Sequence, residues 1–501
     1  MRPGESSREF YQAFAILAGL TALPIWSVGY LPLVDLPQHE AQISILRHWN
    51  DPACGYPGIY EINWLTPYWL SYAFAVALAW AVGVVAAVKV ALTLVLVAIP
   101  LAARRLVREL GGDEWWALLC FPLGFGFPLS WGFFSFLAAV PFVLWALGDA
   151  FRYARAPTAP GGLRLGLMCA ALFAVHALAM AFAVLLVAAL VAAETPRLRE
   201  LPRRAWPLLL ALPLPLAWWL GSLRADAAHR TTTRLQLGLF RLGDLPVLLT
   251  GIPWRWVALT ATAAVLLSLA ATFPAPSRTR SRWVPFALAT AIVLLAPNIL
   301  LGTAYLAPRF TVFLLPTLLC ALDRPHGAPV ARWRRLQTAG VAGLLLLFAQ
   351  ARFAGMEREG RGLAELLREA PAGRRLLYFG YEFRSRYSPE PVFLHSGARY
   401  QVERCGVADK SFAGNFPSPV RYRPGAALPL PPLVEYLPHR FRWDEHGGDR
   451  VDLVLVRSRR EPNVRRIGGA PGRRLALLAH RERWWLYENV ERRPTERASS
   501  P

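Results

Sequence analysis

The stretch FYQAFAILAGLTALPIWSVGYLPLVDLPQHE, residues 10–40, joins an apolar run to a short polar segment. The run from Phe10 to Leu33 is long enough to cross a hydrocarbon core of about 30 Å as a helix. It leads into Asp35-Leu36-Pro37-Gln38-His39-Glu40, which places two carboxylates and an imidazole just beyond a predicted membrane span. Ionisable side chains gathered at a helix end that faces water are candidates for chemistry.

The composition is that of an integral membrane protein. Hydrophobic residues make up 55% of the 501 residues, charged residues make up 18%, and the mean hydropathy is +0.32. These values are too apolar for a soluble chain of this length. The net charge of +22 does not predict a nucleic-acid partner, because the basic residues are scattered between apolar segments. Nearly all of them are Arg, with Lys only at positions 89 and 410.

Clusters of arginine predict the topology. Short loops rich in Lys and Arg stay in the cytoplasm, so the connections that carry these clusters are expected inside. Sparse or acidic turns lie between them, such as the stretch from Asp35 to Glu61, where Arg47 is the only Arg or Lys. The clusters are Arg104-Arg105-Arg108, Arg152-Arg155-Arg164, Arg197-Arg199-Arg203-Arg204, Arg278-Arg280-Arg282 and Arg324-Arg332-Arg334-Arg335.

With the N-terminus placed in the cytoplasm, the pattern predicts a polytopic α-helical protein of about eleven transmembrane helices. The loop 223–245 departs from the rule, since it is expected outside yet carries four arginines. No convincing cleavage site follows the first span, which we interpret as a retained signal anchor. The predicted spans are 10–33, 84–103, 115–129, 131–150, 163–178, 180–193, 205–222, 246–272, 283–302, 308–322 and 335–353.

The segment from Pro67 to Gly83 is apolar and aromatic, but counting it as a span breaks the arginine pattern downstream. We interpret it as a helix in the outer interface of the membrane, where Trp and Tyr rings are favoured. A true span with Gly83 in a tight turn is the alternative. Residues 1–354 are therefore expected to form a transmembrane domain whose first outer loop is 34–83.

Residues 355–501 differ from the rest, with dense charge, many prolines and no spanning segment. Hydrophobic patterning predicts a helix over 362–369, strands over 375–379 and 451–456, and a terminal hairpin over 475–488. We expect a small α/β domain, which is extracytoplasmic because the number of spans is odd. Cys54 and Cys405 would both face this oxidising side, where they either pair or remain two unrelated thiols.

The layout resembles the GT-C superfamily of membrane glycosyltransferases. The resemblance rests on a first span, an outer loop that opens with Asp-x-x-x-His-Glu, an aromatic segment around Thr66-Pro67-Tyr68-Trp69, and a span ending in Arg104-Arg105. It implies a GT-C-like fold and transfer of a sugar from a polyprenyl-phosphate carrier on the outer face of the membrane. His39-Glu40 departs from the acidic patterns of many relatives, which leaves the use of a divalent cation open.

Asp35 is the candidate general base of such a transfer. An acceptor hydroxyl must lose a proton while a phosphate leaves, and a carboxylate can take that proton. His39 and Glu40 are candidates to orient the acceptor, share the proton or hold a cation. On a helix that starts near Pro37 they point about 100° apart, so they need not act together. The alternative for Asp35 is structural, since Asp before a helix that opens with Pro is a favoured cap.

Four further residues are candidates for binding the substrate. Arg309, in Tyr305-Leu306-Ala307-Pro308-Arg309-Phe310, resembles the arginine that GT-C enzymes place near the carrier phosphate, and Tyr305 is assigned to the same site. A guanidinium binds phosphate through two hydrogen bonds, although snorkelling to lipid headgroups is the alternative. His176 is an ionisable group within a predicted span, so it is either functional or a neutral packing residue. His395 either lines an acceptor site or stabilises the fold.

The sequence therefore predicts a bacterial inner-membrane glycosyltransferase that acts on the extracytoplasmic side. Its partners would be a polyprenyl-phosphate-linked sugar donor, a cell-envelope glycan, lipid or protein acceptor, and membrane lipids, with no nucleic acid. Two rival hypotheses are a transporter or flippase of lipid-linked saccharide and a non-catalytic envelope scaffold. A transporter predicts internal repeats and paired polar residues deep within the spans, and neither is evident in the sequence.

Overall fold

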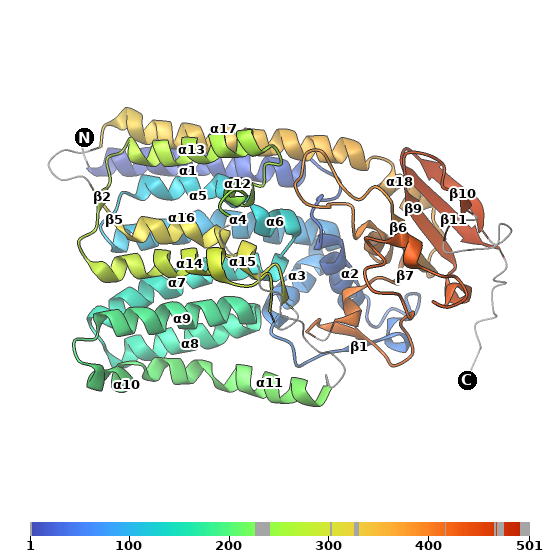
Figure 1. The fold of residues 1–501 in the computed structure, drawn as a ribbon, viewed down its shortest axis with the longest axis horizontal. Coiled ribbons are helices and arrows are strands. Elements are labelled where there is room, and N and C mark those ends of the chain that lie inside the picture. Colours follow the sequence, from blue (N-terminus) through green and yellow to red (C-terminus); the bar gives the residue numbers. More distant parts are fainter. Residues whose placement is uncertain are drawn as a thin grey trace. The chain divides into compact units, whose positions relative to one another are not determined.

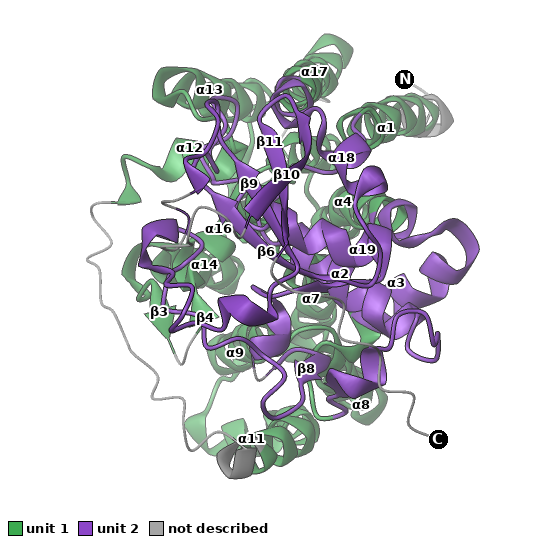
Figure 2. Ribbon diagram, turned by 90° about the vertical axis from the view of Figure 1, so that its right-hand side faces the viewer, with its two compact units in different colours: residues 1–27, 65–71, 89–354 green, residues 28–64, 72–88, 355–501 purple. Residues whose placement is uncertain are grey.

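The computed structural model describes residues 3–225, 241–300, 303–324, 330–415, 417–464, 467 and 475–490. The chain divides into two compact units (Figure 2). Unit 1 comprises residues 1–27, 65–71 and 89–354, and unit 2 comprises residues 28–64, 72–88 and 355–501. The first outer loop expected at 34–83 is thus shared between the units. Most of the arginine-bearing loop 223–245 lies outside the described residues.

Unit 1 is built from helices that run alongside one another (Figure 1). Within the described residues, four helices are long and apolar enough to cross a membrane, namely α4, α7, α9 and α17. Helices α7, α8 and α9 pack on one another, and α14 packs on α16. The main helices are α1 (Pro3–Trp26), α4 (Val84–Glu109), α7 (Phe134–Arg155), α8 (Ala159–Val175), α9 (Ala177–Glu194), α11 (Pro213–Ala225), α13 (Arg255–Ala270), α14 (Val284–Leu295), α16 (Thr311–Cys320) and α17 (Arg332–Gly360).

Short elements connect these helices. The helical turns are α5 (Cys120–Leu123), α6 (Phe127–Trp131), α10 (Leu201–Arg204), α12 (Leu245–Thr250), α15 (Leu306–Arg309), η2 (Glu114–Leu119), η3 (Leu198–Glu200), η4 (Trp206–Ala211) and η6 (Arg280–Trp283). Two pairs of short antiparallel strands join β2 (Ala275–Pro276) to β5 (Leu322–Asp323) and β3 (Ile299–Leu300) to β4 (Thr303–Ala304).

Several predicted spans are not single helices. The first helix ends at Trp26 rather than Leu33, because the residues that follow include Ser, Gly and Pro, which favour helix termination. The predicted span 115–129 is divided among η2, α5 and α6, since residues 121–128 contain two prolines and two glycines. A total of eleven spans stays a prediction.

Several arginines of the predicted cytoplasmic clusters are paired with carboxylates in unit 1. Asp149 on α7 is buried and forms ion pairs with Arg105 on α4, Arg152 on α7 and Arg164 on α8. On α17, Arg335 lies 3.1 Å from a carboxylate oxygen of Asp113, a residue that is itself 2% exposed. These arginines therefore have a structural role, holding helix ends together, that the topology rule does not require.

Unit 2 is centred on a five-stranded sheet with the order β10-β11-β9-β6-β7. Strand β6 is parallel to β7 and β9, whereas β9, β11 and β10 are antiparallel neighbours. Its strands are β6 (Arg375–Gly380), β7 (Val407–Ala408), β9 (Leu453–Arg457), β10 (Leu475–Arg481) and β11 (Trp484–Asn489). The other elements are α2 (Leu36–Arg47), α3 (Trp69–Val82), α18 (Leu363–Glu369), α19 (Arg399–Arg404), β1 (Tyr60–Ile62), β8 (Val420–Tyr422), η1 (Tyr56–Gly58), η7 (Ser396–Ala398), η8 (Phe412–Gly414), η9 (Pro438–Arg440) and η10 (Gly448–Arg450).

The local predictions for residues 355–501 are confirmed element by element. The helix expected over 362–369 is α18, and the strands expected over 375–379 and 451–456 are β6 and β9. The terminal hairpin is formed by β10 and β11. Strand β9 is buried along its whole length, as a continuous apolar run predicts for a strand covered on both faces.

The aromatic segment predicted at 67–83 forms helix α3, of 14 residues. A helix of that length spans about 21 Å, which is shorter than a hydrocarbon core. Gly83 adopts a φ of 81°, a left-handed conformation that suits glycine, and separates α3 from α4. The helix is confirmed, and its place in the outer interface stays a prediction.

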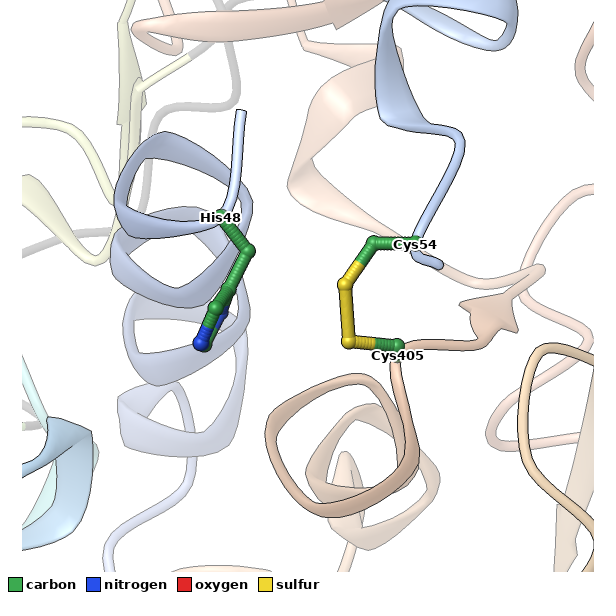
Figure 3. A group of neighbouring side chains, drawn as sticks. All are labelled: His48, Cys54 and Cys405. Carbon is green, nitrogen blue, oxygen red and sulfur yellow. A yellow bond between two sulfur atoms is a disulfide. The ribbon is translucent and has the colours of Figure 1, made fainter. Parts of the chain in front are cut away.

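Two links within unit 2 join the early loop to the C-terminal third of the chain. Strand β1 pairs with β8 in antiparallel register, with Tyr60 opposite Tyr422. Cys54 and Cys405 form a disulfide across a separation of 351 residues (Figure 3). The structure therefore contains the Cys54–Cys405 pair, which the sequence left as one of two alternatives.

Replacement of both disulfide cysteines, Cys54→Ser with Cys405→Ser, is expected to lower the free energy of unfolding by about 2–5 kcal/mol, because the link closes a long loop in the unfolded chain. Thermal unfolding of the purified protein measures the effect. A reductant should lower the unfolding temperature of the wild type and leave that of the double variant unchanged. An equal response of the two proteins would contradict a stabilising disulfide.

Candidate active site

Helix α2 places the first candidate residue, Asp35. The helix opens with proline in its first turn, and Asp35 occupies the N-cap position. Its backbone carbonyl accepts hydrogen bonds from the amides of Gln38 and His39, but its carboxylate makes no capping bond. The side-chain cap expected as the structural alternative is therefore not formed. The carboxylate sits at the positive end of the helix dipole, which favours a negative charge there.

The carboxylate of Asp35 faces an imidazole from the C-terminal third of the chain. Its Oδ1 lies 3.5 Å from Nε2 of His395, and the two side chains are 14% and 7% exposed. His395 immediately precedes η7, within the segment that connects β6 to α19. The structure thus brings together two predicted site residues that are 360 positions apart in the sequence.

His39 lies one helical position from Glu40 and has different neighbours. Its Nδ1 is 2.5 Å from the hydroxyl of Tyr72 on α3. The ring of Phe412 contacts both imidazoles edge-on, with centroids 5.5 Å from His39 and 6.0 Å from His395. An aromatic ring therefore lies against both histidines and shapes the apolar side of the site.

Glu40 is fully buried and forms an ion pair with Arg399. Nη1 of Arg399 donates a hydrogen bond of 2.5 Å to Oε2 of Glu40, and Nη2 donates one of 2.8 Å to the carbonyl of Leu31. The guanidinium also lies over the ring of Tyr30, 4.1 Å from its centroid. A carboxylate enclosed in this way fixes the position of α2 relative to Arg399. His39 and Glu40 contact separate partners, as their angular separation on the helix predicts.

Gln38, Gln42 and Ser44 of α2 are also buried, and they bond to the C-terminal third of the chain. Gln38 donates to the carbonyl of Lys410 and accepts from the amide of Phe412, at 2.7 and 3.0 Å. Gln42 accepts from the amide of Val420 at 2.9 Å. These bonds give α2 a fixed position and orientation in unit 2.

The other predicted site residues belong to unit 1, where they surround the start of α7. His176 is an extended residue between α8 and α9, and its ring lies 5.3 Å from that of Phe136. Arg309 places its guanidinium 3.4 Å from the ring centroid of Phe133 and donates to the carbonyl of Ala304.

Tyr305 precedes α15 with a φ of 55°, a conformation that is rare for a residue other than glycine. Its ring lies 4.0 Å from that of Trp131, on α6. Residues in strained backbone conformations cluster at binding sites, so this conformation supports Tyr305 as a candidate site residue. Tyr305 and Arg309 are therefore neighbours of one aromatic group, since Trp131 also contacts Phe133.

The sequence left open whether the site holds a divalent cation. Among the described residues, the one group of three potential ligands is His48, Cys54 and Cys405 (Figure 3). Both sulfur atoms are committed to the disulfide, and thiolates are what a metal binds, so this group does not fit a metal ion. Nδ1 of His48 lies 3.0 Å from the carbonyl of Ser44 instead.

Sequence reasoning missed two residues that shape the site. Arg399 is the lone charge in the apolar and small stretch Val392–Gln401 apart from His395, and an isolated charge of this kind is a signal for a buried partner. Phe412 carries no comparable signal, because an aromatic residue in a loop has many possible positions.

No protein-family model matches the sequence, and no curated protein matches it. Two solved structures share the fold along nearly the whole chain. They are crystal structures of ArnT from Cupriavidus metallidurans, one bound to undecaprenyl phosphate and one in the apo state, with TM-scores of 0.59 and 0.52. In both cases the identity is 12%, and the match covers 97% of this chain and 98% of that chain. At this level of identity the matches show that the chain shares the fold of ArnT.

Substitution of Arg399 by Met is expected to destabilise unit 2 by about 3–5 kcal/mol, because it leaves the Glu40 carboxylate buried without its cation. Unfolding of the purified protein measures the loss. The double variant Glu40→Gln with Arg399→Met should be less affected than the sum of the two single variants. Strict additivity would contradict a direct buried pair.

Burial raises the pKa of Glu390 to about 7, while the charge of Arg384 acts in the opposite direction. The folded state then binds a proton more tightly than the unfolded state between pH 4.5 and 7, so stability falls as pH rises through that range. Glu390→Gln is expected to remove this decline and to stabilise the protein by on the order of 2 kcal/mol at pH 8. Unfolding temperatures from pH 5 to 8 measure the effect, and parallel curves for variant and wild type would contradict it.

Proposed function

We propose that this chain is a membrane glycosyltransferase that moves a sugar from a polyprenyl-phosphate carrier to a cell-envelope acceptor, with Asp35 as the general base. The fold supports the reaction class, since ArnT, which shares it, was crystallised with undecaprenyl phosphate. The assignment of Asp35 as the base rests on the position and surroundings of its carboxylate. It occupies a cap position without capping, retains 14% exposure and faces an imidazole.

The chemistry fits a single carboxylate. The acceptor oxygen forms a bond to the anomeric carbon as the bond from that carbon to the phosphate oxygen breaks. The electron pair of the broken bond leaves with the carrier phosphate, and the hydroxyl proton of the acceptor passes to Asp35. Positioned bases of this kind contribute about 10²–10⁴ in rate. Glu40 is assigned to structure instead, because its charge is already matched by Arg399.

The leaving phosphate requires positive charge, for which we propose Arg309. Its guanidinium is partly buried against Phe133, and such surroundings strengthen an interaction with an anion. Tyr305 contacts Trp131 and His176 contacts Phe136, and both are proposed to shape the site for the carrier.

We further propose that unit 2 lies on the extracytoplasmic side of a bacterial inner membrane. The Cys54–Cys405 disulfide supports this placement, because disulfides persist in oxidising compartments and are rare in the cytoplasm. The acceptor is then a component of the cell envelope.

Asp35→Asn is expected to reduce transfer of labelled sugar from polyprenyl-phosphate donors by at least about 10²-fold, because the amide cannot take the acceptor proton. The unfolding temperature should be retained, since the carboxylate makes no capping bond. Purified wild type and variant are compared in the same donor extract.

The chain offers a matched control in Asp244. Asp244 occupies the N-cap position of α12 and begins a second Asp-Leu-Pro sequence. Its side chain, like that of Asp35, makes no capping bond. Asp244→Asn should transfer sugar at the wild-type rate. Equal transfer by the wild type and Asp35→Asn would remove Asp35 as the base, and transfer by neither would leave the transporter and scaffold hypotheses.

A further inference from the structure

The turn that carries His395 is held rigidly against the central sheet of unit 2. The hydroxyl of Tyr378 on β6 donates to the carbonyl of Phe393 at 2.7 Å, and Ser396 donates to the same carbonyl at 3.1 Å. A Cβ added at Gly397 would lie 2.4 Å from the Cβ of Tyr378, so the backbone approaches β6 more closely than any other residue would allow. Arg399, four residues after His395, fixes the chain to Glu40.

The two nitrogens of His395 have different surroundings. Nε2 faces Asp35, whereas Nδ1 is buried and has no hydrogen-bond partner among the residues the structure describes. An imidazole that carries its proton on Nε2 satisfies both conditions, because it can donate to the carboxylate and leaves no buried N–H at Nδ1. The geometry therefore favours a neutral imidazole with its hydrogen directed at Asp35.

Accessibility distinguishes the roles of the two side chains. A base must be reached by the acceptor, and Nδ1 of His395 is closed to solvent while the other imidazole nitrogen is turned to Asp35. The Asp35 side chain is twice as exposed as that of His395. The imidazole is consequently unsuited to take a proton from the acceptor, and Asp35 is suited to do so.

We infer that His395 is a positioning residue for Asp35, supplied to the site by the C-terminal third of the chain; this inference rests on the proposed function. Its Nε2–H holds Oδ1 of the carboxylate and leaves Oδ2 for the acceptor hydroxyl. The separation of 3.5 Å exceeds that of an ordinary N–H···O bond, and such contacts in unliganded enzymes shorten when the substrate is bound. The acceptor thus completes the alignment of its own base.

The charged and titratable groups near His395 are Asp35, together with Tyr378, Asp409, Lys410 and Glu435, which line the same small cavity. Lys410 and Glu435 pair with each other at 3.3 Å, and Asp409 lies 3.6 Å from Arg375.

The test compares His395→Phe and His395→Gln with the wild type in steady-state transfer from polyprenyl-phosphate sugar. His395→Phe, which lacks the donor, should lower kcat about tenfold or more and leave KM for the donor within about twofold. His395→Gln, whose amide can donate from near the Nε2 position, should recover most of the loss.

His446→Gln is the control, because His446 is a partly buried histidine of unit 2 that accepts a hydrogen bond from the amide of Arg442. It should match the wild type in kcat. An unchanged kcat in a folded His395→Phe, or a His395→Gln that recovers none of the lost kcat, would overturn the inference. The proposed function fails separately, through a wild type that transfers no sugar or an Asp35→Asn that transfers normally.

Discussion

The buried ion pair between Glu40 and Arg399 is the constraint from which the geometry of the site follows. Its two side chains are 1% and 4% exposed and come from residues 359 positions apart. Removing both charges from water is costly, so the pair must be closely hydrogen-bonded to persist. Arg399 meets this requirement by also binding the carbonyl of Leu31. Asp35 and His395 each lie within five residues of the pair, so it also sets their separation.

Helix α2 extends this constraint along its length. Gln38 and Gln42 bond to backbone groups between residues 410 and 420, much as a neighbouring strand would. Buried amides are expensive unless satisfied, and both polar atoms of the Gln38 side chain are bonded, so this residue specifies one docking of the helix and disfavours others. A segment between apolar stretches therefore folds with the C-terminal third of the chain. The disulfide from Cys54 to Cys405 fastens the same two parts.

The sequence contained the local structure of unit 2 but not its long-range pairing. Apolar alternation and continuous apolar runs predicted β6, β9 and the β10–β11 hairpin, because these patterns depend on neighbours in the chain. Gln38, Glu40 and Gln42 look like solvent-facing residues of a polar helix, since their partners are more than 350 positions away. In unit 1, helices lie within the predicted hydrophobic runs, but prolines and glycines divide some of these runs into short helices.

The two Asp-Leu-Pro sequences separate what local sequence decides from what the fold decides. Asp35 and Asp244 both occupy N-cap positions, both precede a helix with proline in its first turn, and neither carboxylate caps. Local chemistry therefore starts a helix in the same way at both sites. The difference lies in long-range context: Asp244 is exposed, whereas Asp35 is mostly enclosed and faces His395. A carboxylate becomes a candidate base here because a distant segment, held by Arg399, delivers an imidazole to it, and that delivery has no signature in the six residues from Asp35 to Glu40.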